Sequence, residues 1–238
     1  MYANSIARIA SLIGEAGRIR MLTTLLDGRS HSASELAMAA GASPQTASSH
    51  LSKLLAGGLI VGQRSGRQRL FRLKSADVAA AIEALGALAP DCGVSAAPDI
   101  RFARSCYDHL AGILAVALRD QLLSSGALKQ GKDSFVLTSS GELLLRSLDI
   151  EADSLHALRR SFAHKCLDWT ERRHHIGGAV GAALLSGFLQ RKWLARIGKT
   201  RAVRLTYEGE SEFERRFGIH AGELRFTEVR TRPAIARK

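Results

Sequence analysis

Hydrophobic residues recur at helical spacing through the first part of the chain. Their positions predict one helix around residues 6–13 and a second around residues 19–26. Ser32 and Glu35 form an S-x-x-E capping box, which predicts a third helix that begins after Ser32 and ends at Gly41.

The next helix carries the most information about function. Ser43 is a favourable N-cap residue and Pro44 stands at the first helical position, so the helix is expected to run to about Ala56. Its apolar residues should pack on the preceding helices: Ala47, Leu51, Leu54 and Leu55. The other side is short and polar, and we name as groove-facing candidates Gln45, Thr46, Ser48, Ser49, His50 and Lys53. A solvated face usually carries more charge, whereas short polar side chains suit contact with base edges.

A basic hairpin is expected directly after this helix. Residues 59–61 and 70–73 are rich in β-branched and aromatic side chains and predict two strands. The turn between them contains a glycine and three arginines, Arg64, Arg67 and Arg69. A basic hairpin alone is more often simply solvated. After a helix-turn-helix, it indicates a wing that contacts phosphate or the minor groove.

The run ELAMAAGASPQTASSHLSKLLAGGLIVGQRSGRQRLFRL resembles the DNA-binding head of the ArsR/SmtB family of bacterial repressors. The match covers roughly residues 5–88 and rests on the S-x-H-L-x-x-L-x-x-x-G-L pattern and the basic wing. The resemblance implies a winged helix-turn-helix domain over residues 1–88 that forms a homodimer through its first and last helices. It further implies a pseudo-palindromic double-stranded operator and repression that a bound metal or a thiol modification relieves.

The chain departs from this family at its sensing residues. Many members carry a Cys-x-Cys in the helix before the recognition helix, and residues 35–39 here contain no cysteine. The helix after Ser75 offers Asp77 and Glu83 but no histidine for the metal site that other members build there. We therefore expect any sensing to lie after residue 99.

Residues 89–99 contain two of the four prolines and predict a linker. Residues 100–238 then suggest a duplication, with copies at about 100–150 and 160–219. Each copy is expected to be winged-helix-like, with a long helix over residues 99–124 in the first and an L-T-x-x-G-E helix start in both. The expected fold class is mainly α with small β-hairpins (α+β), a winged helix-turn-helix followed by two repeated halves.

Cysteine, histidine and aspartate recur in the two copies. On the predicted helix, residues three apart share a face. The effector candidates are Cys106, Asp108, His109, Cys166 and Asp168. Two thiolates with imidazole or carboxylate would suit a soft divalent metal, and the same thiols could instead form a redox-switched bridge. A purely structural role is the plainer alternative, and a small organic effector in a cleft lined by Tyr107, His109, Trp169 and Arg172 is a third.

Charge and composition narrow the class of protein. The chain has 238 residues, 46% of them hydrophobic, and a formal net charge of +12, which favours a polyanionic partner. We expect no membrane partner, because no apolar run approaches the length of about 18 residues that a span needs. We also see no signal peptide, and three irregularly spaced cysteines fit a reducing cytoplasm.

The sequence therefore predicts a sequence-specific transcriptional regulator, a homodimeric repressor controlled by a signal at its C-terminal part. A non-specific architectural DNA-binding protein is the alternative that charge alone favours. A thiol-dependent enzyme with a DNA-binding head is a weaker alternative, because we find no nucleophile elbow, phosphate loop or dinucleotide fingerprint. We expect no enzyme. A second basic segment, residues 191–204, has six Lys or Arg and no acid, and is either a further DNA contact or a solvated hairpin.

Overall fold

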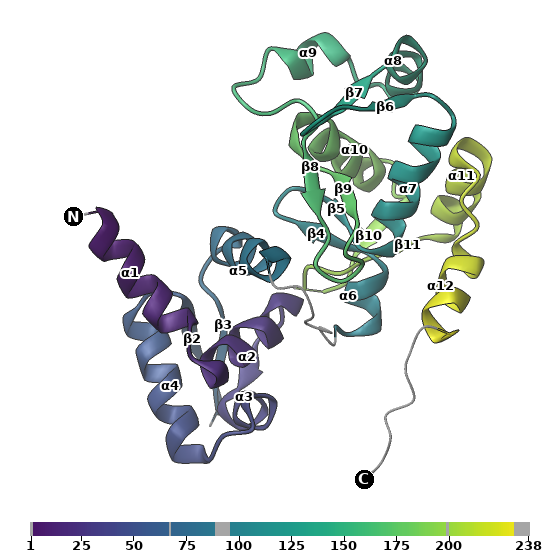
Figure 1. Ribbon diagram of the computed structural model, residues 1–238. Coiled ribbons are helices and arrows are strands. Elements are labelled where there is room, and N and C mark those ends of the chain that lie inside the picture. Colours follow the sequence, from purple (N-terminus) through teal and green to yellow (C-terminus); the bar gives the residue numbers. More distant parts are fainter. Residues whose placement is uncertain (1, 67, 89–95, 199, 231–238) are drawn as a thin grey trace. The chain divides into compact units, whose positions relative to one another are not determined.

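A computed structural model describes residues 2–66, 68–88, 96–198 and 200–230 of the chain (Figure 1). It divides into two compact units, the first formed by residues 1–92 with 198–201 and the second by residues 93–197 with 202–238. Most of the predicted linker, including Cys92, lies outside the described residues, as does Arg67.

The first unit is a helical head with a small antiparallel sheet. Its helices are α1 (Tyr2–Ile13), α2 (Ala16–Thr24), the 3-10 turn η1 (Leu25–Asp27), α3 (Ala33–Ala40), α4 (Pro44–Ala56) and α5 (Ala76–Leu88). Its strands are β1 (His31–Ser32), β2 (Ile60–Ser65) and β3 (Gln68–Leu73), in the order β1-β3-β2. This arrangement is the predicted winged helix-turn-helix.

The helix ends of this head follow from the residues that cap them. The Glu35 amide donates to the Ser32 hydroxyl, and the Ser32 amide donates to the Glu35 carboxylate, so the predicted capping box is confirmed. Gly41 ends α3 at a φ of 64°, a left-handed conformation in which a side chain would be strained. Ser43 caps α4 by accepting from the Thr46 amide. Local side-chain chemistry therefore sets the turn between α3 and α4.

The second unit alternates hairpins and helices. Its helices are α6 (Pro98–Phe102), α7 (Ile113–Ser124), α8 (Ser139–Arg146), α9 (Ala152–His156), α10 (Gly178–Gln190), α11 (Tyr207–Phe217) and α12 (Ala221–Arg230). Its strands form four antiparallel hairpins: β4 (Arg104–Cys106) with β5 (His109–Ala111), β6 (Leu128–Gln130) with β7 (Phe135–Leu137), β8 (Lys165–Leu167) with β9 (His174–Ile176), and β10 (Leu194–Arg196) with β11 (Val203–Leu205).

The element order hairpin, helix, hairpin, helix occurs twice along this unit. The two L-T-x-x-G-E segments begin helices as predicted, since Thr138 caps α8 and Thr206 caps α11 through their side chains. The fold is mainly helical with small antiparallel hairpins, which confirms the predicted class. The duplication of the sequence itself stays a prediction.

The predicted helix over residues 99–124 is wrong. Helix α6 ends at Phe102, the hairpin β4–β5 follows, and α7 begins only at Ile113. Gly112 stands between hairpin and helix at a φ of 92°, and a Cβ there would lie 2.5 Å from the Arg101 carbonyl oxygen. Tertiary pairing thus overrides the helical spacing of the apolar residues, and Cys106 and His109 lie on paired strands.

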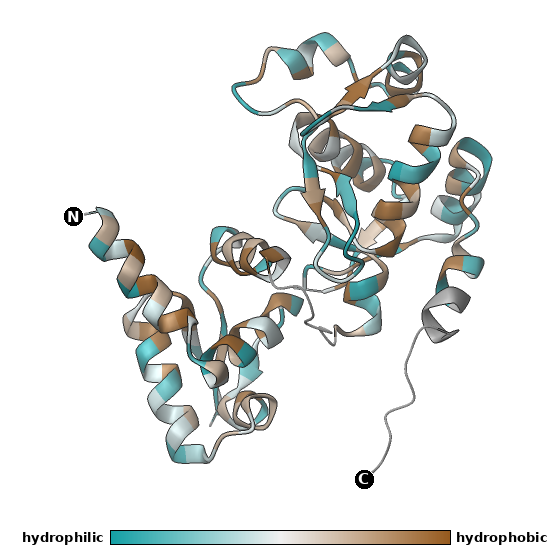
Figure 2. Cartoon of the chain, in the orientation of Figure 1, coloured by the Kyte–Doolittle hydropathy of each residue, from teal (hydrophilic) through white to brown (hydrophobic). Residues whose placement is uncertain are grey.

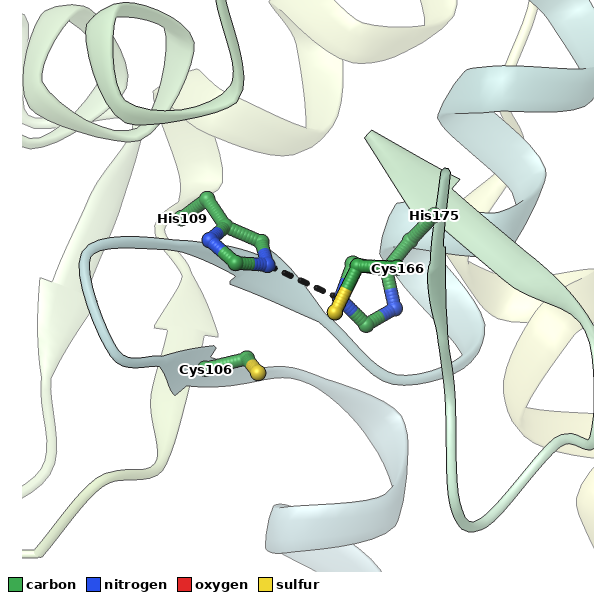
Figure 3. Close-up of side chains that lie close together, drawn as sticks. All are labelled: Cys106, His109, Cys166 and His175. Carbon is green, nitrogen blue, oxygen red and sulfur yellow. Dashed lines mark hydrogen bonds between the residues drawn. The ribbon is translucent and has the colours of Figure 1, made fainter. Parts of the chain in front are cut away.

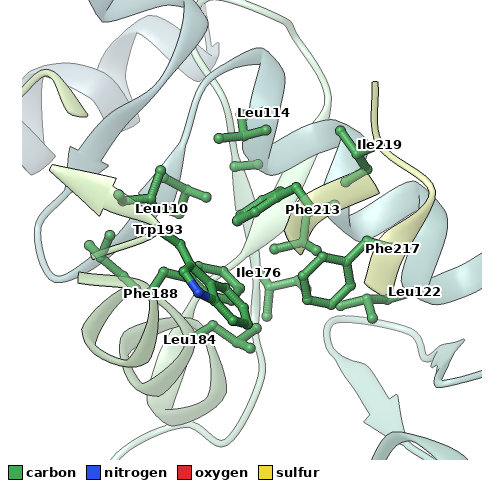
Figure 4. Close-up of a cluster of buried hydrophobic side chains, with 14 of the residues drawn as sticks. Leu110, Leu114, Leu122, Ile176, Leu184, Phe188, Trp193, Phe213, Phe217 and Ile219 are labelled. Atoms are coloured by element: carbon green, nitrogen blue, oxygen red, sulfur yellow. The ribbon is translucent and has the colours of Figure 1, made fainter. Parts of the chain in front are cut away.

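Aromatic side chains fill the core of the second unit beside α10 and α11 (Figure 4). Phe188 packs against Phe213 with ring centroids 4.9 Å apart, and against Trp193 at 5.7 Å. Phe213 has no exposed surface. Among the described residues, every helix is too short or too polar to cross a membrane.

Replacing Phe213 with alanine should lower the free energy of unfolding of the second unit by about 3–5 kcal/mol, because the ring leaves a cavity in a packed core. Chemical denaturation of the full chain, followed by circular dichroism and tryptophan fluorescence, measures the loss. Tyr207→Ala is the matched control, since this aromatic residue of the same helix is 89% exposed. Equal midpoints for the two variants would contradict the packing described.

Candidate functional site

The polar face of α4 is open, as a groove-reading helix requires. Its exposed residues are Gln45, Thr46, Ser48, Ser49, Ser52 and Lys53. The opposite face is closed, because Ala47, Leu51 and Leu54 are each at most 3% exposed and pack into the head. Helix α4 therefore presents a row of short hydrogen-bonding side chains with a single lysine.

His50 lies apart from this row. Only 12% of its side chain is exposed, and its Nε2 lies 3.4 Å from Glu15 Oε2. Gly17 allows this approach, because a Cβ at that position would stand 3.0 Å from the same nitrogen. His50 thus braces α4 against the start of α2, and it is not among the side chains that α4 exposes.

The wing extends further than the sequence predicted. Strands β2 and β3 pair from Ile60 with Leu73 as far as Ser65 with Gln68, which places Arg64 directly opposite Arg69. Like charges opposite each other destabilise a hairpin. Among the described residues, neither arginine has an ion-pair partner, although the Arg69 guanidinium lies 5.4 Å from the Phe71 ring centroid. The wing therefore carries positive charge that the head does not neutralise.

A cleft of about 450 Å³ separates α4 from the wing. Its polar lining comes from three elements: Ser32 and Ser34 at the start of α3, Ser48 and Ser52 on α4, and Gln68 and Arg69 on β3. Hydroxyls, a guanidinium and the first turn of a helix are all groups that hydrogen-bond phosphate oxygens. The cleft is therefore suited to a nucleic-acid backbone running between helix and wing.

The second unit holds a different cluster, made of Cys106, His109, Cys166 and His175 (Figure 3). One ligand atom from each residue lies within 4.8 Å of all the others. Within each hairpin the cysteine and histidine are direct cross-strand partners, Cys106 with His109 and Cys166 with His175. The structure thus brings together three of the five predicted effector residues, and adds His175.

His175 was not among the effector candidates that the sequence indicated. His109 follows Cys106 by three positions in the sequence, whereas His175 follows Cys166 by nine. The longer β8–β9 connection hides the equivalence of the two histidines. The sequence does contain a sign that the two histidines are equivalent. Each stands three positions before a glycine at the start of a long helix, Gly112 or Gly178.

The two predicted aspartates lie behind the histidines. Asp108 Oδ1 is 3.3 Å from His109 Nδ1, and Asp168 Oδ2 is 3.2 Å from His175 Nδ1. The far nitrogens of the two rings then face each other, with 3.1 Å between His109 Nε2 and His175 Nε2. Burial lowers the pKa of His175, but its contacts with Asp168 and Cys106 outweigh burial and raise that pKa above its ordinary value.

Asp168 is the most constrained of these groups. It has no exposed surface, and Oδ1 accepts from Arg104 Nη2 at 3.0 Å while Oδ2 accepts from the Gly112 amide at 2.6 Å. Burial alone would raise the pKa of this carboxyl, yet the Arg104 guanidinium and His175 hold the pKa well below its usual range. Asp168 is therefore an ionised, buried anchor for the hairpin that carries His175.

Asp108 lies beside His109 as Asp168 lies beside His175, but its side chain is less buried. Its Oδ2 accepts from Arg160 Nη1 at 2.6 Å, and a third of its side chain is exposed. Partial burial raises the pKa of the Asp108 carboxyl, but the Arg160 hydrogen bond outweighs it and leaves the pKa below its usual value. Each histidine of the cluster thus has a carboxylate, and each carboxylate has an arginine.

The residues proposed to line an organic-effector cleft differ widely in their exposure. Trp169 is 6% exposed and lies against the Arg104 guanidinium, while Tyr107 is 58% exposed. Two clefts of the second unit have other linings, one around Leu122 and Phe217 and the other around Phe102 and Arg225.

Comparison with known proteins places this architecture among regulators. A family model described as a helix-turn-helix domain matches residues 17–63. The uncharacterized HTH-type transcriptional regulator YdfF of Bacillus subtilis (strain 168) is 43% identical over 221 residues, which cover 90% of this chain and 98% of that protein.

Solved structures resemble the chain over its head. One is the winged helix-turn-helix domain of Mb0332 from Mycobacterium bovis, a possible ArsR-family regulator, with 26% identity, a TM-score of 0.34 and coverage of 37% of this chain and 80% of that one. Another is the transcriptional repressor BigR from Xylella fastidiosa, with 27% identity, a TM-score of 0.35 and coverage of 38% and 91%.

Proposed function

We propose that the chain, which belongs to the HTH-type transcriptional regulators, is an ArsR-like, homodimeric, cytoplasmic repressor that recognises a specific operator. The observation that carries this proposal is the exposed, short and nearly uncharged face of α4 beside a cleft and an arginine wing. Ser48, Ser49 and Gln45 would hydrogen-bond base edges. Arg64, Arg69 and Lys53 would hold the phosphate backbone.

The exposure of α1 supports the proposed dimer. This 12-residue helix contains no buried residue, and its apolar side chains include Tyr2 at 82% and Ile6 at 51% exposure. Helices this short are marginal in water unless their apolar face is covered. Helix α5 leaves Leu85 and Leu88 exposed as well, and hydrophobic segments run along both helices (Figure 2). We infer that a second copy covers these two helices.

We propose that the second unit senses the regulatory signal. A thiol-dependent enzyme is disfavoured, because Cys106 is only 7% exposed and shares its surroundings with other potential ligands of a metal. A nucleophile needs access to its substrate and a base that is not already committed. Control through metal, thiol chemistry or a small molecule at this unit therefore remains the proposed mode of regulation.

Operator selection from a random DNA library, followed by binding measurements, tests the proposal. We expect the double variant Ser48→Ala, Ser49→Ala to lose at least about 10-fold of its preference for the selected site over a scrambled one, since each good base contact contributes about 1–3 kcal/mol. Arg69→Ala should instead weaken binding to both sequences and flatten the salt dependence by about one unit of slope.

Ser211→Ala is the matched control, a serine-to-alanine change on an exposed helix face of the second unit. It should leave both affinities unchanged. Parental site preference in the Ser48, Ser49 double variant would show that α4 does not read the groove. A library that yields no preferred site would favour the architectural alternative.

A further inference from the structure

We propose that Cys106, His109, Cys166 and His175 bind one zinc ion in a closed, four-ligand site within the second unit. The four ligand atoms lie within 4.8 Å of one another, and the two imidazole nitrogens are 3.1 Å apart. Tetrahedral zinc with its usual bond lengths places two nitrogens about 3.3 Å apart and two sulfurs about 3.8 Å apart. The side chains therefore need only small movements to meet one ion.

The hairpins set this geometry before any ion arrives. Each one holds its cysteine opposite its histidine, so both side chains of a pair leave the same face of two hydrogen-bonded strands. A Cβ on Gly181 of α10 would come within 3.0 Å of the His109 Cβ, so the absence of a side chain there leaves room for the ring. Backbone pairing supplies a preorganised set of two sulfurs and two nitrogens.

The ring nitrogens point to a cation between them. Each Nδ1 lies beside a carboxylate, Asp108 for His109 and Asp168 for His175, which favours a proton on Nδ1. The two Nε2 atoms face each other at 3.1 Å, a hydrogen-bond distance when one of them carries a proton and also close to the separation of two nitrogens that ligate one zinc ion. In zinc proteins, a carboxylate often accepts from the ring nitrogen opposite the metal. This contact orients the histidine ligand and raises its basicity.

The charges balance around such an ion. Zinc would offset the two thiolates, while Arg104 and Arg160 already neutralise Asp168 and Asp108. Soft thiolates with imidazole nitrogens favour zinc over magnesium or calcium, which prefer oxygen ligands. Cys166 is the least buried of the four residues and would give the ion its path in.

Four protein ligands leave no open position, so the site is structural and not catalytic. It would tie together two hairpins whose cysteines stand 60 residues apart in the sequence. Its position differs from the metal sites that the ArsR/SmtB resemblance implies, because the head contains neither those cysteines nor the histidine. The inference does not depend on how the head reads DNA.

Metal analysis of the full-length, reduced chain tests the site directly. We expect one tightly held zinc per chain after chelator washing. Cobalt in place of zinc should give the intense visible absorption of a tetrahedral ion and a thiolate-to-cobalt charge-transfer band. Cys106→Ser and Cys166→Ser should each lose about half of the charge-transfer intensity and at least about 100-fold in zinc affinity. Asp108→Asn should weaken zinc about 10–100-fold and leave the cobalt band shape unchanged.

Two matched controls keep the result interpretable. Cys92→Ser removes the remaining cysteine, and His174→Gln changes the neighbour of His175 on the same strand; both should retain full zinc and the full cobalt spectrum. Zinc should also raise the melting temperature of the parent chain and not that of Cys166→Ser. A reduced parent chain that takes up no zinc at micromolar concentration would overturn the proposal, as would an octahedral cobalt spectrum or one unaffected by both cysteine variants.

Discussion

Asp168→Asn is expected to lower the free energy of unfolding of the second unit by about 3–5 kcal/mol. Asp168 and Arg104 have no exposed side-chain surface, and their charged groups are 3.0 Å apart. Asparagine has nearly the same shape but no charge, so it removes the negative charge that faces the buried Arg104 guanidinium. The change also weakens the hydrogen bond from the Gly112 amide, which fixes the start of α7. Urea denaturation of the full chain measures the loss.

A double-mutant cycle separates the charge effect from other damage. Arg104→Met keeps an unbranched side chain of similar length but removes the guanidinium that lies over the Trp169 ring. It should also destabilise, because the buried Asp168 carboxylate loses its arginine. The double variant should lose clearly less stability than the sum of the single changes, since it leaves neither charge unpaired. Glu151→Gln, at an exposed ion pair with Arg146, is the control and should have no measurable effect. Strict additivity across the cycle would show that the pair does not act as a unit.

The head was predictable from sequence because its decisive signals are local. Ser32 and Glu35 determine where α3 begins, Gly41 where it ends, and Ser43 with Pro44 where α4 begins. Each of these effects acts within four residues, so it can be predicted from the sequence alone. The exception is His50, whose neighbour Glu15 stands 35 positions earlier.

The second unit was harder because its determinants are distant in sequence. The apolar residues between 99 and 124 have helical spacing. However, Arg104 in this segment donates a buried hydrogen bond to Asp168, which lies 64 positions away. Arg104 lies on a hairpin, whereas the spacing of the apolar residues around it predicts a helix. The same distance effect conceals His175, since nothing in the spacing of the β8–β9 segment reveals which residue pairs with Cys166. The sequence suggested that Cys106 and Cys166 could approach each other, and the structure places them together, although Cys106 lies on a strand and not on the predicted helix.

Ile6→Asp is expected to convert the regulator to a monomer and to weaken operator binding by at least about 100-fold. An aspartate on the exposed apolar face of α1 would have to be buried, without a partner, in the dimer that we propose. A two-site operator gains about 10²–10⁴ in affinity from joining two heads, and a monomer forfeits that gain. Light scattering measures the mass, and titration against the selected operator measures the affinity.

Leu143→Asp is the matched control for this change. Leu143 is a large apolar residue on α8 of the second unit and is 63% exposed. Its replacement by aspartate changes the exposed surface and the charge in the same way as Ile6→Asp, but at a site outside α1 and α5. It should remain dimeric and bind the operator as the parent does. Helix α1 has no buried side chain of its own, so Ile6→Asp should cost the full chain at most the helical signal of α1 in circular dichroism and leave the other elements folded. A dimeric Ile6→Asp chain with parental affinity would mean that some other surface joins the two copies, and that α1 is covered by something else.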